Sequence, residues 1–206
     1  SPDGRQIAFS RAGLYRPYSM GGMTWDNYDL YVMNADGSHL RRQTRAQFYS
    51  LNAIHFSPDS HRLSFLATPH FHDFAGSGAV SGCYTMAVDS RDGLMPIPHP
   101  LGNVYDRLWS PDGHSAAWVF APRNTYSWDI YLQPVNGPLS APLGAFKNGT
   151  HIDGPVFSSH GSRLFYLQGD NADVSIAELW QLDTASLHRH RVADSKLFFD
   201  PLHWRQ

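Results

Sequence analysis

The stretch His70-Phe71-His72-Asp73 holds the residues best suited to chemistry in this sequence. In extended backbone, side chains two positions apart point to the same side, so His70 and His72 could both bind one Zn²⁺ or Mn²⁺ ion. Beyond Asp73, no further ligand is adjacent to them in the sequence. We therefore expect no bound cofactor, and His70 and His72 stay candidate metal ligands.

Motifs of the common enzyme classes are missing from the sequence. It contains no Gly-x-Ser-x-Gly nucleophile elbow, no His-Glu-x-x-His zinc motif and no glycine-rich phosphate loop. The single cysteine, Cys83, stands in no motif, and we expect it to pack as a small apolar residue. The sequence favours a binding role over catalysis.

The composition is that of a folded protein with a mixed surface. Of 206 residues, 42% are hydrophobic, 14% aromatic and 17% charged, with a net charge of -2, which argues against disorder. The short basic runs Arg41-Arg42 and His188-Arg189-His190-Arg191 are expected on edge strands, where positive charge blocks pairing, so we expect no nucleic-acid partner. No apolar run approaches the ~18 residues of a membrane span.

A hairpin between Tyr28 and Thr44 is the unit from which the elements are inferred. Its first half alternates apolar and polar residues, and Asp36-Gly37 indicates a tight turn. A second turn, Ser-Pro-Asp-Gly at Ser1–Gly4, precedes an apolar strand. This turn returns at residues 57–60, 110–113 and, in degraded form, 158–161. A spacing of about 50 residues is that of a four-stranded propeller blade with one enlarged loop.

We predict an all-β protein, a β-propeller of four-stranded antiparallel blades, of which four are visible. The chain is predicted to be a single domain, with blades at about 1–47 plus 200–206, 48–101, 102–146 and 147–199. The segment Asp200–Trp204 has the form of the missing inner strand of the first blade, with Trp204 in the place of Trp109. A closed four-blade ring, part of a larger ring, and two chains forming eight blades are all open.

The repeated pattern resembles the TolB-like β-propeller repeat, a relative of the WD repeat. An aromatic residue (Phe56, Trp109 or Phe157) precedes each internal copy of the turn, and an apolar strand follows the turn. In the first copy, Asp-Leu-Tyr-Val-Met-Asn-Ala-Asp-Gly-Ser and then Arg-Arg-Gln-Thr come after this strand. The resemblance covers nearly the whole chain and implies the fold, together with a periplasmic or extracellular location in bacteria. It does not single out a function, because the matched residues build turns and strands. The chain lacks an initiating methionine and opens inside a repeat, so we expect a processed or trimmed product.

Loop lengths predict which end of the propeller recognises a partner. The connections expected at one end are short, and those expected at the other hold insertions at residues 11–27, 69–82, 122–127 and 169–175. Loops on a rigid scaffold carry function, and aromatic and methionine residues are enriched in interface cores. The predicted partner-binding residues are Tyr15, Tyr18, Met23, Trp25, His70, Phe71, His72, Phe74, Tyr126 and Trp128. In the alternative, several of them fold inward and cap the propeller.

His55 and His203 take equivalent places in the predicted inner strands of neighbouring blades. If the ring closes, both approach its central channel. The simpler interpretation is a polar, hydrogen-bonded or hydrated channel lining. The more specific interpretation is a metal site, for which His55 and His203 are candidate ligands.

We expect a non-enzymatic interaction or scaffold module that docks onto a protein partner or a multi-subunit complex, with an envelope assembly as one setting. The alternative is a metal-dependent carbohydrate-active enzyme. The resemblance implies it, because some relatives are polysaccharide lyases that hold a metal with histidines at the ring centre. It would need His55, His203 and a third ligand. A purely structural subunit is a third alternative.

Overall fold

A computed structural model describes residues 1–18, 22–69, 82–91, 93–99, 102–122, 128–134, 137, 143, 150–170 and 173–193. These residues form antiparallel strands and turns, and no helix is present among them, so none that could cross a membrane. The all-β prediction is confirmed. The predicted inner strand at 200–206 lies outside the described residues.

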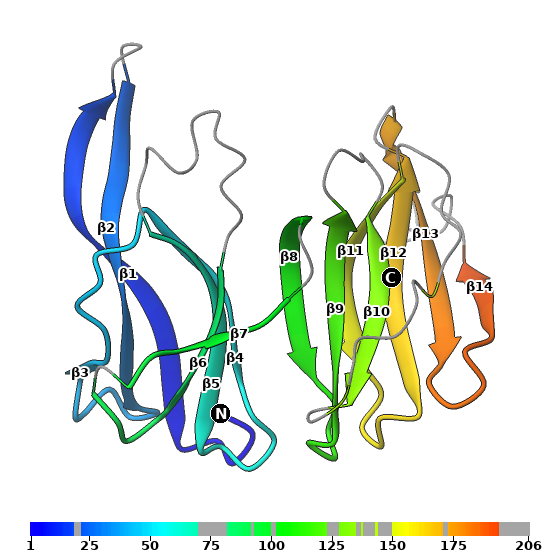
Figure 1. The fold of residues 1–206 in the computed structure, drawn as a ribbon, viewed down its shortest axis with the longest axis horizontal. Helices are drawn as coiled ribbons and strands as arrows, with labels where there is room; N and C mark the ends of the chain where they lie inside the picture. Colours follow the sequence, from blue (N-terminus) through cyan, green and yellow to red (C-terminus); the bar gives the residue numbers. More distant parts are fainter. Residues whose placement is uncertain are drawn as a thin grey trace, which may run out of the picture. The chain divides into compact units, whose positions relative to one another are not determined.

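The first two sheets are built by strands that follow one another in the chain (Figure 1). The first has the order β1-β2-β3, and the second has the order β4-β5-β6-β7. Their bounds are β1 (Gln6–Tyr18), β2 (Gly22–Asn34), β3 (Arg41–Arg42), β4 (Ser50–Phe56), β5 (Arg62–Thr68), β6 (Gly82–Ala87) and β7 (Met95–Ile97).

The last two sheets have the orders β10-β9-β8 and β11-β12-β13-β14. Their strands are β8 (Gly102–Trp109), β9 (Ser115–Pro122), β10 (Asp129–Pro134), β11 (Thr150–Phe157), β12 (Arg163–Asp170), β13 (Asp173–Asp183) and β14 (Arg189–Ala193). In every sheet, sequence neighbours are sheet neighbours, which is the up-and-down order of propeller blades. The basic runs lie on β3 and β14, at sheet edges as predicted.

The chain divides into two compact units, Ser1–Trp109 and Ser110–Gln206. In the first unit, one core joins the first two sheets: Leu30 and Val32 of β2 pack with Leu63 and Phe65 of β5. The amide of the fully buried Gln43 donates to the Val88 carbonyl, 2.9 Å away. In the second unit, the largest buried side chains are Trp118, Tyr166, Ile130, Ile152, Leu164 and Leu182. That the whole chain forms a single domain stays a prediction.

The Ser-Pro-Asp-Gly turn has one backbone conformation in all four copies. The amide of the fourth residue donates to the carbonyl of the first at 2.9–3.0 Å, and the fourth residue has a left-handed φ of 61–72°. Glycine takes this conformation without strain, and Ser60 takes it in the second copy. The four residues are Gly4, Ser60, Gly113 and Gly161. The degraded copy is therefore a true repeat of the turn, as predicted.

Side chains of the turn bond to the strand that follows it. The Ser110 hydroxyl donates to Asp112 (Oγ to Oδ1, 2.5 Å) and accepts from the backbone amide of Ser115 at 2.9 Å. Asp112 also accepts from the amide of His114 at 2.9 Å. The turns at Ser1 and Ser57 repeat these contacts. These local bonds explain why the turn sequence alone predicts where each new strand begins.

An acidic residue on the third strand of a blade pairs with an arginine on the fourth in two blades. In the first sheet Arg42 donates to Asp29 at 2.5 Å, and in the last Arg191 donates to Glu178 at 2.8 Å. Each arginine follows its acid by 13 residues. The Asp29 side chain is 3% exposed and the Glu178 side chain 28%, so only the first pair is buried. This pair links the Asp-Leu-Tyr motif to the Arg-Arg-Gln-Thr motif.

Two of the predicted insertions are extended strands instead of loops. Residues 11–18 and 22–27 prolong β1 and β2 into a paired ribbon, in register from Ala12↔Tyr28 to Tyr18↔Gly22. Residues 169–170 and 173–175 prolong β12 and β13, which stay paired to Asp170↔Asp173. The loop prediction was wrong there because glycine and proline in these segments suggested irregular backbone. Ladder pairing satisfies the donors and acceptors that face the partner strand, and water can satisfy those on the outer edges.

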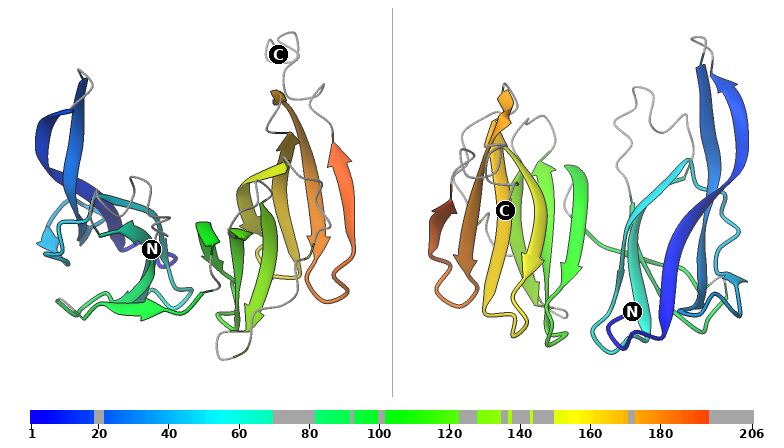
Figure 2. Two further views of the ribbon diagram at one scale, coloured as in Figure 1. Left: turned by 45° about the horizontal axis from the view of Figure 1, so that its top comes forward. Right: turned by 180° about the vertical axis from the view of Figure 1, so that it is seen from behind.

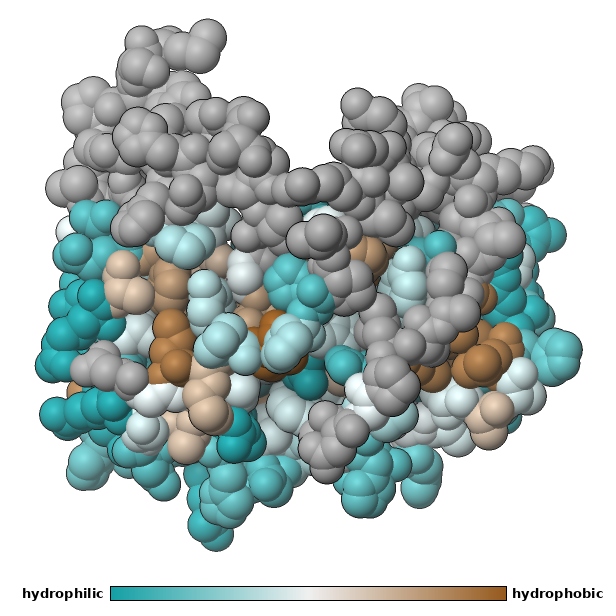
Figure 3. Space-filling model, viewed as in Figure 1, coloured by the Kyte–Doolittle hydropathy of each residue, from teal (hydrophilic) through white to brown (hydrophobic). Residues whose placement is uncertain are grey.

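The exposed apolar side chains of the described residues are dispersed. On the face drawn in Figure 3, brown apolar residues form small areas separated by teal hydrophilic ones. The exposed large apolar side chains belong to different strands and turns: Ile7, Leu40, Met95, Tyr105, Val156, Leu187 and Val192. Single exposed apolar residues are normal in soluble domains and do not indicate an interface.

Replacing Arg42 by methionine should destabilise the protein far more than the matched change Arg191→Met. The first leaves the buried Asp29 carboxylate without its cation, at a cost of about 2 kcal/mol, below the usual figure for buried pairs because the Arg42 side chain is 38% exposed. The second breaks an exposed pair and should cost ~0.5 kcal/mol. Urea unfolding would measure the loss of stability in both variants. Equal losses would contradict the assignment of Asp29 and Arg42 as the structural pair.

The turn aspartates should make stability depend on acid pH. Hydrogen bonds from Ser57 and Ser110 lower the pKa of Asp59 and Asp112 below the ordinary value of 3.8. A depressed carboxyl pKa contributes stability above its unfolded value, and that contribution is lost as pH falls through the folded pKa. The midpoint of urea unfolding should fall more steeply below pH 4 in the wild type than in an Asp59→Asn, Asp112→Asn variant. Parallel pH profiles would show that these carboxyls do not contribute.

Candidate functional site

The β1–β2 ribbon extends beyond the rest of its sheet. The third strand, β3, pairs with β2 only at Tyr31 and Val32, and one further bridge joins Tyr28 to Phe48. From the Ala12↔Tyr28 pair to the Tyr18↔Gly22 pair, the described ladder has two strands. This part of β1 and β2 is the narrow arm coloured blue in Figures 1 and 2. The structure therefore has a paired, regular arm where the sequence predicted a loop.

Register sets which residues of the arm lie opposite each other. Tyr15 lies directly opposite Trp25, and Pro17 lies opposite Met23. Residues that face each other in an antiparallel ladder, and those two apart along a strand, share one face. Three of the predicted partner-binding residues, Tyr15, Met23 and Trp25, thus belong to one face of the arm. Tyr18 lies opposite Gly22 and belongs to the other face.

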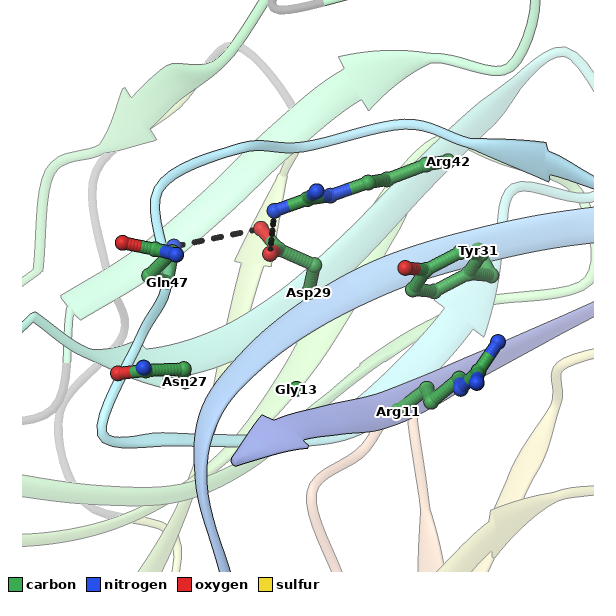
Figure 4. A pocket seen from close by; sticks show the side chains of 7 residues that line it. All are labelled: Arg11, Gly13, Asn27, Asp29, Tyr31, Arg42 and Gln47. Carbon is green, nitrogen blue, oxygen red and sulfur yellow. Dashed lines mark hydrogen bonds and ion pairs between the residues drawn. The ribbon is translucent and has the colours of Figure 1, made fainter. Parts of the chain in front are cut away.

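A pocket of about 200 Å³ lies at the base of this arm (Figure 4). Its lining residues are Arg11, Gly13, Asn27, Asp29, Tyr31, Arg42 and Gln47. Arg11 pairs with Asp29 in the ladder. Because Arg11 and Tyr15 are four residues apart, the pocket and the aromatic pair occupy the same face of the ribbon. Arg11 and Asn27 had been predicted only as parts of a loop, with no role.

Asp29 is the fixed point of the pocket. Its Oδ2 accepts from the Arg42 guanidinium at 2.5 Å. Its Oδ1 accepts from the Thr44 hydroxyl at 2.8 Å and from the backbone amide of Gln47 at 3.3 Å. The Thr44 hydroxyl also accepts from the amide of Leu30 at 3.0 Å. Asp29 is only 2% exposed, so its charge is neutralised inside the protein. The dashed lines of Figure 4 follow two of these contacts.

Arg11 is the charged group of the pocket that remains available. Its guanidinium lies 5.9 Å from the centre of the Tyr31 ring, and Tyr31 in turn stacks on Phe9 with ring centres 5.8 Å apart. Arg11 is exposed, and among the described residues it has no acidic partner. A cation–π contact holds an arginine in place without neutralising its charge.

A second polar cluster joins β4 to β8. His55 Nε2 lies 2.8 Å from Asp106 Oδ1, which also accepts from the backbone amide of Arg107 at 2.7 Å. The Arg107 guanidinium lies 4.3 Å from the centre of the Trp109 ring, and the Trp109 indole donates to Ser64 at 3.1 Å. Both β4 and β8 are the inner strands of the predicted blades. The His55–Asp106 pair is hydrogen-bonded, which agrees with the simpler interpretation of His55 as part of a polar lining.

The candidate metal ligands are not brought together where they are described. In the described part of the chain, no group of three or more histidine, cysteine or acidic side chains could hold a metal. His55 meets a single carboxylate. Cys83 is buried, as predicted, and burial raises the pKa of its thiol to about 12. His203 and the pair His70 and His72 lie outside the described residues.

Of the remaining predicted partner-binding residues, the structure describes only Trp128. Trp128 is half-buried directly before β10. Phe71, Phe74 and Tyr126 lie outside the described residues. Their roles stay predictions.

No family model matches the chain, and no curated protein matches it. Comparison with solved structures does give matches. TolB from Acinetobacter baumannii has a TM-score of 0.63 and 20% identity, with the match covering 92% of this chain and 40% of that one. A putative TolB from Agrobacterium tumefaciens has a TM-score of 0.67 and 18% identity, over 94% and 63% of the two chains.

An oligogalacturonate lyase in complex with manganese is also similar, with a TM-score of 0.59, 13% identity and coverage of 94% of this chain and 63% of that one. The chain thus spans less than two thirds of each of these proteins. At such identities the likeness shows the fold and not the activity. With its four antiparallel sheets of sequential strands, the chain has the TolB-like β-propeller fold that its repeats predicted.

Proposed function

We propose that this chain is a non-catalytic interaction or scaffold module that docks onto a protein partner or a larger assembly. The observation that carries the proposal is the β1–β2 arm, which continues past its sheet and places Tyr15 opposite Trp25 and Pro17 opposite Met23. Aromatic residues and methionine are enriched in the centres of protein interfaces. The arm is the proposed docking surface, and the other predicted partner-binding residues stay candidates.

The physics of a two-stranded ribbon supports docking. An isolated pair of strands is marginally stable in water, because it has too little apolar surface to bury. A partner that covers one face of the arm adds this burial. The register concentrates Tyr15, Met23 and Trp25 on one face, so that face is the one proposed to be covered.

An exported location, periplasmic or extracellular, accompanies the proposal. Its support is the TolB-like fold and the resemblance of the repeats. A docking module of this kind would act within an envelope or extracellular assembly.

A metal-dependent lyase is the second candidate. The similarity to an oligogalacturonate lyase in complex with manganese favours it, and so does the His55–Asp106 pair on two inner strands. Against it, the described residues supply no third ligand to that pair. The docking module needs no transition metal and the lyase does, which separates the two.

Alanine at both Trp25 and Phe71 should abolish capture of the native partner from the host's envelope or culture fluid. Removing two aromatic anchors of an interface typically costs several kcal/mol of binding. The matched control is Leu40→Ala, an exposed apolar residue in the turn after β2, outside the arm. Affinity purification followed by mass spectrometry would measure capture, and circular dichroism would verify the fold. Undiminished capture by the double variant would refute the docking surface.

Elemental analysis of protein purified without a metal-affinity step should find no stoichiometric manganese or zinc. Overnight dialysis against EDTA should leave the unfolding temperature unchanged, because no bound ion contributes to folding. One equivalent of manganese per chain, or a fall in unfolding temperature after EDTA that manganese reverses, would favour the lyase.

A further inference from the structure

We propose that the pocket at the base of the arm binds one carboxylate side chain, an aspartate or glutamate in an extended segment of the protein partner. The inference rests on the proposed function and adds the chemistry that the partner presents. Its residues are Arg11, Asn27, Tyr31 and Gln47, with Asp29 and Arg42 as the fixed floor.

The charges of the pocket select an anion. Arg11 and Arg42 supply two positive charges and Asp29 one negative charge, which leaves one positive charge. Arg42 and Asp29 are already bonded to each other, and Asp29 has its further donors in Thr44 and Gln47. The uncompensated charge is therefore that of Arg11. One carboxylate would neutralise it.

The geometry of arginine suits this ligand. A guanidinium presents parallel N–H donors that match the two oxygens of a carboxylate, and such paired bonds are shorter and stronger than neutral ones. The contact of Arg11 with the Tyr31 ring limits the conformations that Arg11 can take before binding, which lowers the entropy lost on binding. Figure 4 shows the guanidinium end of Arg11 on the side of Tyr31, away from the side chains of Asn27 and Gln47, so Arg11 is the donor proposed for the carboxylate.

The size of the pocket selects a side chain and not a cofactor. Pockets for small-molecule ligands and cofactors span roughly 300–1,000 Å³. The pocket here is about 200 Å³, so it suits the end of a single side chain. A larger ligand would have to extend out of it along the protein surface.

The arm gives the direction in which the rest of the ligand extends. Arg11 and Tyr15 are four residues apart on one strand and share a face, which places them about 14 Å apart along the ribbon. An extended peptide that lies along this face and places a carboxylate at Arg11 would have an apolar or aromatic residue four positions away, near the Tyr15–Trp25 pair. The predicted recognition pattern is one acidic residue separated by three residues from an apolar one.

A library of random dodecapeptides displayed on phage would test this pattern with the whole chain as bait. The wild type should select peptides with an acidic residue at a fixed distance from an aromatic or large apolar one. Bait carrying Arg11→Gln should lose the acidic preference, and bait carrying Arg11→Glu should select lysine or arginine at that position. The matched control Arg5→Gln, an exposed arginine in the first turn, should select as the wild type does.

A synthetic peptide from the selection would show how much the carboxylate contributes to binding. Changing its acidic residue to the isosteric amide should weaken binding to the wild type about fivefold, and should not change binding to Arg11→Gln. Thermal unfolding of each variant within a few degrees of the wild type would show that exposed Arg11 is not needed for folding.

The outcomes separate this inference from the docking function. The carboxylate assignment would be overturned if the wild type selected peptides without an acidic position. It would also be overturned if the Arg11→Gln bait selected the same acidic position as the wild type. Either result would leave docking through the arm intact. Peptides whose binding survives alanine at both Tyr15 and Trp25 would remove the arm as the docking surface. Binding of an acidic oligosaccharide such as oligogalacturonate at Arg11, in place of peptides, would overturn the assignment in favour of a sugar ligand.

Discussion

The buried carboxylate of Asp29 is the contact on which the first blade and its candidate site depend. Arg42, Thr44 and the backbone of Gln47 all bond to it, so it joins β2 to β3 and to the segment that leads into the second sheet. A carboxylate buried without such partners would cost several kcal/mol, so the surrounding chain has one favourable arrangement. The same arrangement forms the floor of the pocket and leaves Arg11 as its available charge.

The sequence predicted the elements whose determinants are local. The Ser-Pro-Asp-Gly turns are recognisable because serine and aspartate bond to backbone groups two to five residues away. The arm could not be recognised in the same way. Gly13, Pro17 and Gly22 are typical of loops, and what makes this segment regular is the long register of β1 on β2, a property of two strands together. The Arg42–Asp29 pair had a sequence signal in the two motifs that contain it, but its burial depends on tertiary packing.

The two candidate surfaces differ in what their chemistry can support. His55 and Asp106 satisfy each other and lie among further hydrogen bonds and ring contacts, which is the pattern of a stable polar lining. The arm has the opposite character: it has two strands only, carries aromatic residues in register and adjoins a pocket with one uncompensated charge. This contrast underlies the assignment of function to the arm.

Photo-crosslinking in the native host tests the central claim most directly. A photoreactive amino acid would be placed at position 25 in one variant and at position 24 in the other, because Trp25 lies opposite Tyr15 on the proposed face and Thr24 lies opposite Arg16 on the other face. The account predicts a discrete protein adduct from position 25 and little or none from position 24. Equal adducts from both positions, or none from position 25 while the partner still co-purifies, would contradict it.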